Sequence, residues 1–146
     1  MSDFNDKKRI VVGVDGSPAS HKALDWAANE AHLRKATLEI DHVWNLPNLG
    51  YGGFITQLDD FENDAKVLLE QISTRARQNY PEIVIETNLL QGPIAPALIE
   101  RGKNSDLLVV GSRGHGGFTG LMLGSVSQQL VHHANFPIVV VHPPQS

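Results

Sequence analysis

Residues 9–44, RIVVGVDGSPASHKALDWAANEAHLRKATLEIDHVW, predict a strand, a capped helix and a second strand. The first six, RIVVGV, are rich in β-branched residues, as in a strand that is covered on both faces. Ser17 before Pro18 is typical of a helix start, because the hydroxyl caps unpaired backbone N–H groups and proline suits the first helical position. The helix, which runs to about residue 35, places small and aliphatic side chains on one face: Leu24, Ala27, Ala28 and Ala31.

The second strand of this unit, TLEIDHVW (37–44), is less purely apolar than the first. Its two alternating sets are Leu38, Ile40 and His42, and Glu39, Asp41 and Val43.

The same alternation of strand and helix continues beyond residue 45. Apolar spacing predicts helices over residues 57–79, within 92–103 and over 125–134, and apolar runs predict strands over 82–90, 106–112 and 136–142. Five strands separated by helices indicate an α/β domain with a parallel sheet, because parallel neighbours need long crossover connections. We expect one domain over residues 1–146, with its core in about 8–142.

Composition narrows the class of protein. Of 146 residues, 41% are hydrophobic and none is cysteine, which excludes disulfides and thiolate metal sites. No apolar run approaches the length of a membrane span, and the first residues, MSDFNDKKR, do not form a secretory signal. The net charge of -4 argues against general nucleic-acid binding. We therefore expect a cytoplasmic protein with neither membrane nor nucleic acid as a partner.

Charge is unevenly distributed along the chain. All 16 Asp and Glu residues lie at or before Asp106, and the stretch 107–146 contains none, although it holds Arg113 and four of the seven histidines. Buried sheet and helix exclude charge, which is one explanation. An anion site kept clear of repelling carboxylates is another, and the two are compatible.

A glycine cluster, GSRGHGGFTGLMLGS (111–125), has six glycines in fifteen positions between an apolar strand and a helix. A glycine-rich turn before a helix presents backbone N–H groups, and the positive end of the helix dipole, to an anion. We expect the N–H groups of Gly124, Ser125, Val126 and Ser127 to face a phosphate, with the hydroxyls of Ser125 and Ser127 as further donors. The alternative is a tight packing turn.

Known phosphate motifs differ in how well they fit this cluster. The P-loop needs a lysine, which 107–146 lacks, and the dinucleotide fingerprint GxGxxG is out of register. The pattern G-2x-G-9x-G-[ST] fits Gly111, Gly114, Gly124 and Ser125. With VVGVDGS (11–17), LLVVGSRGHGG (107–117), LGSVSQQL (123–130) and PIVVVH (137–142) in order, the chain resembles the universal stress protein family, in its ATP-binding branch.

The resemblance implies a Rossmann-like three-layer sandwich: a five-stranded parallel sheet of order 3-2-1-4-5 with helices on both faces. ATP, alone or with Mg²⁺, would cross the ends of strands one and four. Asp15 would bind the ribose hydroxyls, the backbone of Val43 would face adenine and Gly111 would lie against the ribose. The phosphates would be held by Gly114, Gly124, Ser125, Val126 and Ser127, with Arg113 countering their charge. The residues alone leave other roles open, since Asp15 could merely cap the turn and Arg113 could be a solvated loop charge.

The last strand bears on assembly. Its apolar residues Ile138 to Val141 would form an exposed sheet edge, which proteins seldom leave open. The resemblance implies that this strand pairs antiparallel with its copy, giving a homodimer.

These features favour a nucleotide-linked stress-response regulator that binds ATP. Because the phosphate loop has no carboxylate or lysine, and only Asp15 is a nearby acid candidate for a metal, we expect no catalytic residue and at most slow turnover. No set of His, Asp and Glu residues has metal-ligand spacing like that of HExxH. The alternatives are a slow ATP hydrolase, a binder of another adenine nucleotide such as AMP or cyclic AMP, and a nucleotide-independent dimeric interaction module.

Overall fold

The computed structural model describes residues 8–45, 58–113 and 123–143, and these are built around one parallel sheet. The five strands are ordered β3-β2-β1-β4-β5, so the predicted fold class and strand order are confirmed. Their bounds are β1 Arg9–Gly13, β2 Thr37–Trp44, β3 Ile85–Gln91, β4 Leu107–Gly111 and β5 Ile138–Val141. The sheet order reverses between β1 and β4, because the chain moves outward to β3 on one side and to β5 on the other.

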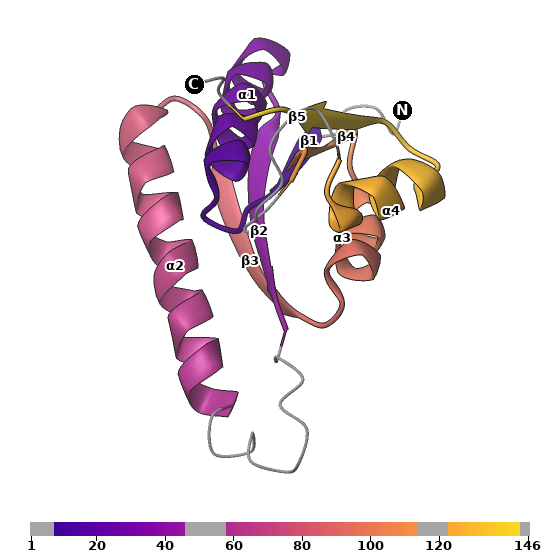
Figure 1. Cartoon of the computed structure of the whole chain (residues 1–146). Coiled ribbons are helices and arrows are strands. Elements are labelled where there is room, and N and C mark those ends of the chain that lie inside the picture. Colours follow the sequence, from indigo (N-terminus) through magenta and orange to yellow (C-terminus); the bar gives the residue numbers. More distant parts are fainter. Residues whose placement is uncertain (1–7, 46–57, 114–122, 144–146) are drawn as a thin grey trace.

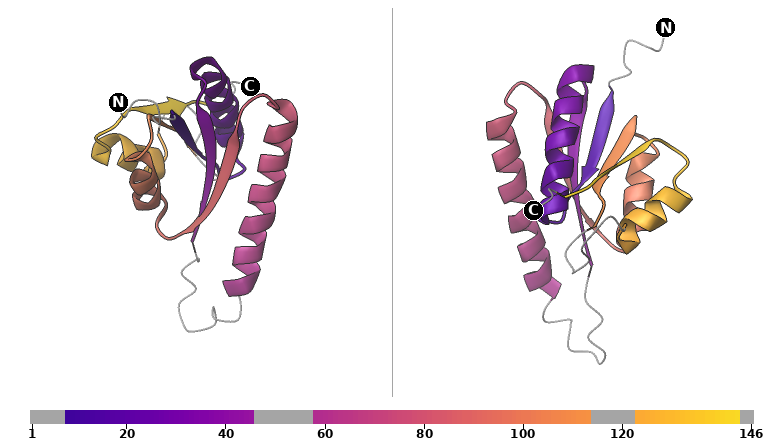
Figure 2. Two further views of the ribbon diagram at one scale, coloured as in Figure 1. Left: turned by 180° about the vertical axis from the view of Figure 1, so that it is seen from behind. Right: turned by 45° about the horizontal axis from the view of Figure 1, so that its top comes forward.

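Helices cover both faces of this sheet (Figure 1). Their bounds are α1 Pro18–Arg34, α2 Leu58–Asn79, α3 Ile94–Gly102 and α4 Ser125–His133. Figure 2 shows α1 and α2 together on one side of the strands, with α3 and α4 on the other. The described residues therefore form three layers.

Two apolar clusters hold the layers together, one on each face of the sheet. In β1, Ile10 and Val12 pack with alanines of α1, whereas Val11 packs with Leu98 of α3 and Leu130 of α4. The alternation follows from the period of two in a strand, and full burial of one such side chain contributes about 1.5–3 kcal/mol. The side chains on both faces of β1 are therefore buried, as its apolar sequence predicts.

The turn between β1 and α1 is fixed by local hydrogen bonds. Ser17 caps α1, because its side chain accepts from the N–H of Ser20 at 3.2 Å. Gly16 has a φ of 81°, which permits the tight turn before the cap. Asp15 is thereby held at the carboxyl end of β1.

Element bounds mostly lie within one or two residues of those predicted. The largest difference is β3, which begins at Ile85 rather than at residue 82. Residues 81–83 form a turn after α2, and the N–H of Ile83 donates to the carbonyl of Tyr80. The chain needs these residues to leave the helix before it can pair with β2.

Candidate functional site

A pocket of about 450 Å³ opens at the carboxyl ends of the strands, beside the point where strand order reverses. Its floor comes from the ends of β1, β2 and β4, and its walls come from α3 and the first turn of α4. Open α/β sheets bind ligands at this position, and the volume lies in the range of small-molecule sites.

The predicted nucleotide residues converge on this pocket. Those within the described residues that line it are Asp15, Val43, Gly111, Arg113, Gly124, Ser125, Val126 and Ser127. Gly114 lies outside the described residues, as does His115. The structure thus brings together residues from four separate segments of the chain, while their contacts to a ligand stay predictions.

At the start of α4, two of the donors that we expected to bind a phosphate form hydrogen bonds within the protein. The N–H of Gly124 donates to the Ser112 carbonyl at 2.6 Å, so this group is not directed at a ligand. The Ser127 hydroxyl donates to the same carbonyl, also at 2.6 Å, and is buried. The hydrogen bonds of these two groups join α4 to the end of β4 instead.

The next three backbone N–H groups of α4, those of Ser125, Val126 and Ser127, lie in the first helical turn, where no carbonyl of the helix can accept them. The N-cap residue, Gly124, has no side chain that could cap the helix. The three residues line the pocket, so the positive end of the nine-residue helix adjoins it.

The glycine at 111 has a packing reason that is independent of any ligand. A Cβ there would lie 2.8 Å from the Cβ of Ala19 and 2.9 Å from its backbone carbon. Because α1 crosses so close to the end of β4, only glycine fits without displacing the helix. Close packing alone therefore explains the glycine at 111, as in the alternative of a tight packing turn. Gly111 also lines the pocket.

Asp15 likewise combines a structural contact with a place in the pocket. Its Oδ1 accepts a hydrogen bond from the N–H of Ser17 at 2.9 Å, which is the turn-capping role considered above. The residue also lines the pocket, at the end of β1. The turn thus holds the Asp15 carboxylate at the pocket, while its contact with a ribose stays a prediction.

Arg113 supplies positive charge to the same pocket. Its Nη1 is buried and has no hydrogen-bond partner among the described residues. Leaving a buried charged donor unpaired is costly, and an anion in the pocket would supply the missing acceptor.

Sequence reasoning missed a second carboxylate in the pocket, that of Asp41. Asp41 lines the pocket from β2, in addition to Asp15. Asp41 is fully buried, and burial, followed by hydrogen bonding and charge from Glu39, raises the pKa of Asp41 to about 8. The available signal was a pair of carboxylates on one side of a strand that two helical layers cover.

Two further findings concern metal and membrane sites. Among the described residues, no three His, Asp or Glu side chains are grouped as a metal site would require. His42 instead contacts the Val14 carbonyl through Nδ1 at 2.8 Å, which gives it a structural role. In the ranges that the structure describes, no helix is long and apolar enough to cross a membrane.

The fold and the position of the pocket define a doubly wound α/β protein with a ligand site at the switch point of its sheet. Residues 7–142 match the model of the universal stress protein family, and the chain belongs to this family. A universal stress protein of Mycolicibacterium smegmatis is 35% identical over 138 residues, which cover 92% of this chain and 45% of that protein. This chain spans about half the length of the curated relatives it matches.

Solved structures agree with this assignment. Universal stress protein UspA from Lactobacillus plantarum has a TM-score of 0.78 at 23% identity, with 94% of this chain and 99% of that chain covered, which shows the shared fold. A universal stress protein in complex with cAMP is 28% identical, with a TM-score of 0.68 and coverage of 94% and 98%.

Proposed function

We propose that this chain binds ATP in the pocket and acts as a nucleotide-linked regulator of the stress response. The observation that carries the proposal is the buried Nη1 of Arg113, which has no partner in the part of the chain that the structure describes and lies in the same pocket as the first turn of α4. A guanidinium nitrogen without an acceptor, next to unpaired N–H groups at a helix N-terminus, suits the phosphates of a nucleotide. The pattern G-2x-G-9x-G-[ST] supports the same ligand.

The ligand would lie along the carboxyl ends of the strands. Its phosphates would meet Arg113 and the N–H groups of Ser125 to Ser127, and its ribose would meet Asp15. Adenine would lie against Val43, between β2 and α3. Mg²⁺ would arrive with the phosphates rather than in a preformed site, because the described residues group no three metal-ligating side chains.

A second candidate is another adenine nucleotide in the same pocket, such as AMP or cyclic AMP. A solved universal stress protein in complex with cAMP, which is 28% identical to this chain, supports this second candidate. Hydrolysis of ATP has less support, because residues 111–113 and 123–127 offer neither lysine nor carboxylate beside the phosphates.

The experiment is mass spectrometry of nucleotide that co-purifies with the protein, followed by calorimetric titration with ATP, ADP, AMP and cyclic AMP. We expect ATP to bind most tightly, with heat that saturates at one site per chain. If cyclic AMP binds more tightly than ATP, the second candidate ligand is the correct one. Absence of binding by all four nucleotides would overturn the proposal and leave the interaction module.

We also propose that the chain forms a homodimer through β5. This strand is at the sheet edge, and its four residues, Ile138 to Val141, are only partly buried. An apolar edge with unpaired backbone groups is a template for pairing with a second strand.

A further inference from the structure

Two carboxylates are buried side by side on one face of β2, and they differ in their hydrogen bonds and ion pairs. Glu39 and Asp41 have no exposed surface, and both lie on the α3 side of the sheet. Asp41 pairs in register with Gly13 of β1, and both residues line the pocket. Gly13 has no side chain, and Leu98 of α3 packs over it, so that a Cβ at Gly13 would lie 3.0 Å from Leu98 Cδ1.

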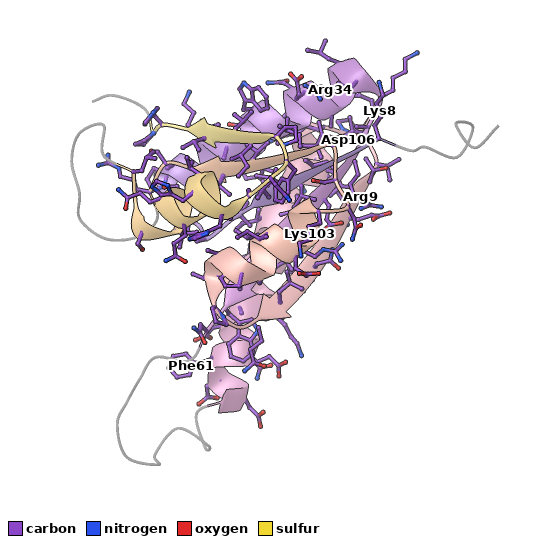
Figure 3. All side chains as sticks on the ribbon, turned by 90° about the vertical axis from the view of Figure 1, so that its right-hand side faces the viewer. Lys8, Arg9, Arg34, Phe61, Lys103 and Asp106 are labelled. Carbon is purple, nitrogen blue, oxygen red and sulfur yellow. The ribbon has the colours of Figure 1, made fainter. Side chains whose placement is uncertain are left out.

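In this cluster, the arginine side chains make their shortest contacts in the buried pair with Glu39. Arg101 of α3 donates to its two oxygens at 2.8 and 2.7 Å, and Arg9 donates to Oε1 at 2.8 Å. Arg9 lies where β1 begins, near Lys8 and Asp106, at the end of the sheet remote from the pocket (Figure 3). Arg9 also donates to Glu86 of β3 at 2.7 Å. Two guanidinium groups are therefore balanced by two carboxylates, Glu39 and Glu86.

Asp41 is left with weak partners. Asn88 of β3 donates to its Oδ1 at 3.3 Å, and Nε of Arg101 lies 3.7 Å from its Oδ2. Oδ2 has no hydrogen-bond partner among the described residues. A proton on Asp41 would remove the negative charge that these weak partners do not balance, which agrees with the raised pKa of Asp41. Burial alone would raise the pKa of Glu39, but its hydrogen bond from Arg101 lowers it.

We propose that Asp41 is a ligand-determining residue of the pocket: as a neutral carboxyl it lets the pocket take a polyanionic nucleotide, and as a carboxylate it opposes one. The inference rests on the proposed nucleotide function. Since Asp41 is fully buried, it acts through its charge rather than by touching the ligand. A buried charge is poorly screened by solvent. A negative charge on Asp41, in addition to that of Glu39, would therefore repel the phosphates.

The test is calorimetric titration of the whole chain with ATP and with adenosine between pH 7 and pH 9, without added metal. In the wild-type protein the Kd for ATP should rise with pH, approaching the about tenfold change that one group with a pKa of about 8 allows over this range. Adenosine carries no phosphate charge, so its Kd should stay constant. In Asp41→Asn, which keeps a neutral polar group of the same shape, the Kd for ATP should not depend on pH.

A matched control is Asp64→Asn, which removes an exposed carboxylate from α2 on the opposite face. It should keep the pH dependence of the wild-type protein. Equal pH dependence of ATP binding in the wild-type protein and Asp41→Asn would overturn the inference, as would equal pH dependence for ATP and adenosine. ATP binding at pH 7 without any pH dependence refutes only the role of Asp41, whereas no binding at pH 7 refutes the proposed function.

A second measurement needs no variant. ATP titrations at pH 8 in two buffers of different ionisation enthalpy report the protons taken up on binding. Because a group with a pKa of about 8 is half protonated in the free protein at this pH, we expect uptake of about half a proton. Uptake of none would contradict the inference even if Asp41→Asn failed to fold.

Discussion

The Ser127 hydroxyl donates to the carbonyl of Ser112 at 2.6 Å, and this hydrogen bond joins the first turn of α4 to the end of β4. Both residues are buried. In Ser127→Ala the loss of this bond should lower the free energy of unfolding by about 1 kcal/mol, and should weaken ATP binding because the helix start is less fixed. Urea unfolding and calorimetry measure the two effects. Ser125→Ala, at an exposed position in the same turn, is the control and should leave stability nearly unchanged.

Close packing between β4 and α1 makes residue 111 sensitive to a single methyl group. Gly111→Ala places a Cβ 2.8 Å from that of Ala19, which should lower the free energy of unfolding by about 1–3 kcal/mol. Thermal and urea unfolding report this loss. The double variant Gly111→Ala with Ala19→Gly should lose less than the sum of the single changes, because one of the two methyl groups is gone. Strict additivity would show that the two residues do not clash.

Arg113 should contribute more to a charged nucleotide than to a nucleoside. In Arg113→Ala the loss of a charge-assisted hydrogen bond, about 1.5–3 kcal/mol, should weaken ATP binding about ten- to hundredfold. Adenosine binding should change much less. Arg75→Ala removes an exposed arginine of α2, on the other face of the sheet, and should have no effect on either ligand. An ATP affinity of Arg113→Ala equal to that of the wild-type protein would refute the assignment of Arg113 to the phosphates.

Asp41 should also make folding stability depend on pH. Burial, and next the hydrogen bond and charge of Glu39, raise its pKa from the ordinary 3.8 to about 8. Between these values the folded protein holds a proton that the unfolded chain releases, so the contribution of Asp41 to the free energy of unfolding falls as pH rises. The fall ends once pH exceeds the folded pKa.

Urea unfolding at pH 5, 7 and 9 tests this dependence. The pKa of Glu39 is lowered below 4.5, so Glu39 stays ionised across this range and does not add to the slope. The difference in stability, Asp41→Asn minus wild type, should therefore increase from pH 5 to pH 9. A constant difference would show that Asp41 has an ordinary pKa in the folded protein.

Local patterns predicted the layers and the place of the pocket well. The apolar run before Gly111 and the cap at Ser17 are signals carried by neighbouring residues, and parallel strands bring their carboxyl ends to one edge. The role of Asp41 depends on contacts that sequence spacing does not contain. Arg101 reaches from α3 to both oxygens of Glu39 and leaves Asp41 with a longer contact of 3.7 Å.

The same limit applies to the donors of α4. Sequence identified the helix start, but it could not show that the N–H of Gly124 and the hydroxyl of Ser127 both bind the Ser112 carbonyl. That competition arises only when the end of β4 and the start of α4 meet in space. A motif therefore predicted which residues gather at the pocket better than which of their atoms face a ligand.

The edge strand β5 allows a direct test of the homodimer. The carbonyls of Pro137 and Val141 accept hydrogen bonds from β4, so by alternation the backbone groups of Val140 point to the open edge. Val140→Pro should remove an edge donor while sparing the bonds to β4. We expect it to shift sedimentation in analytical ultracentrifugation from dimer to monomer, whereas Val140→Ala should remain dimeric. A wild-type chain that sediments as a monomer at all concentrations would refute pairing through β5, and so would a Val140→Pro protein that stays dimeric.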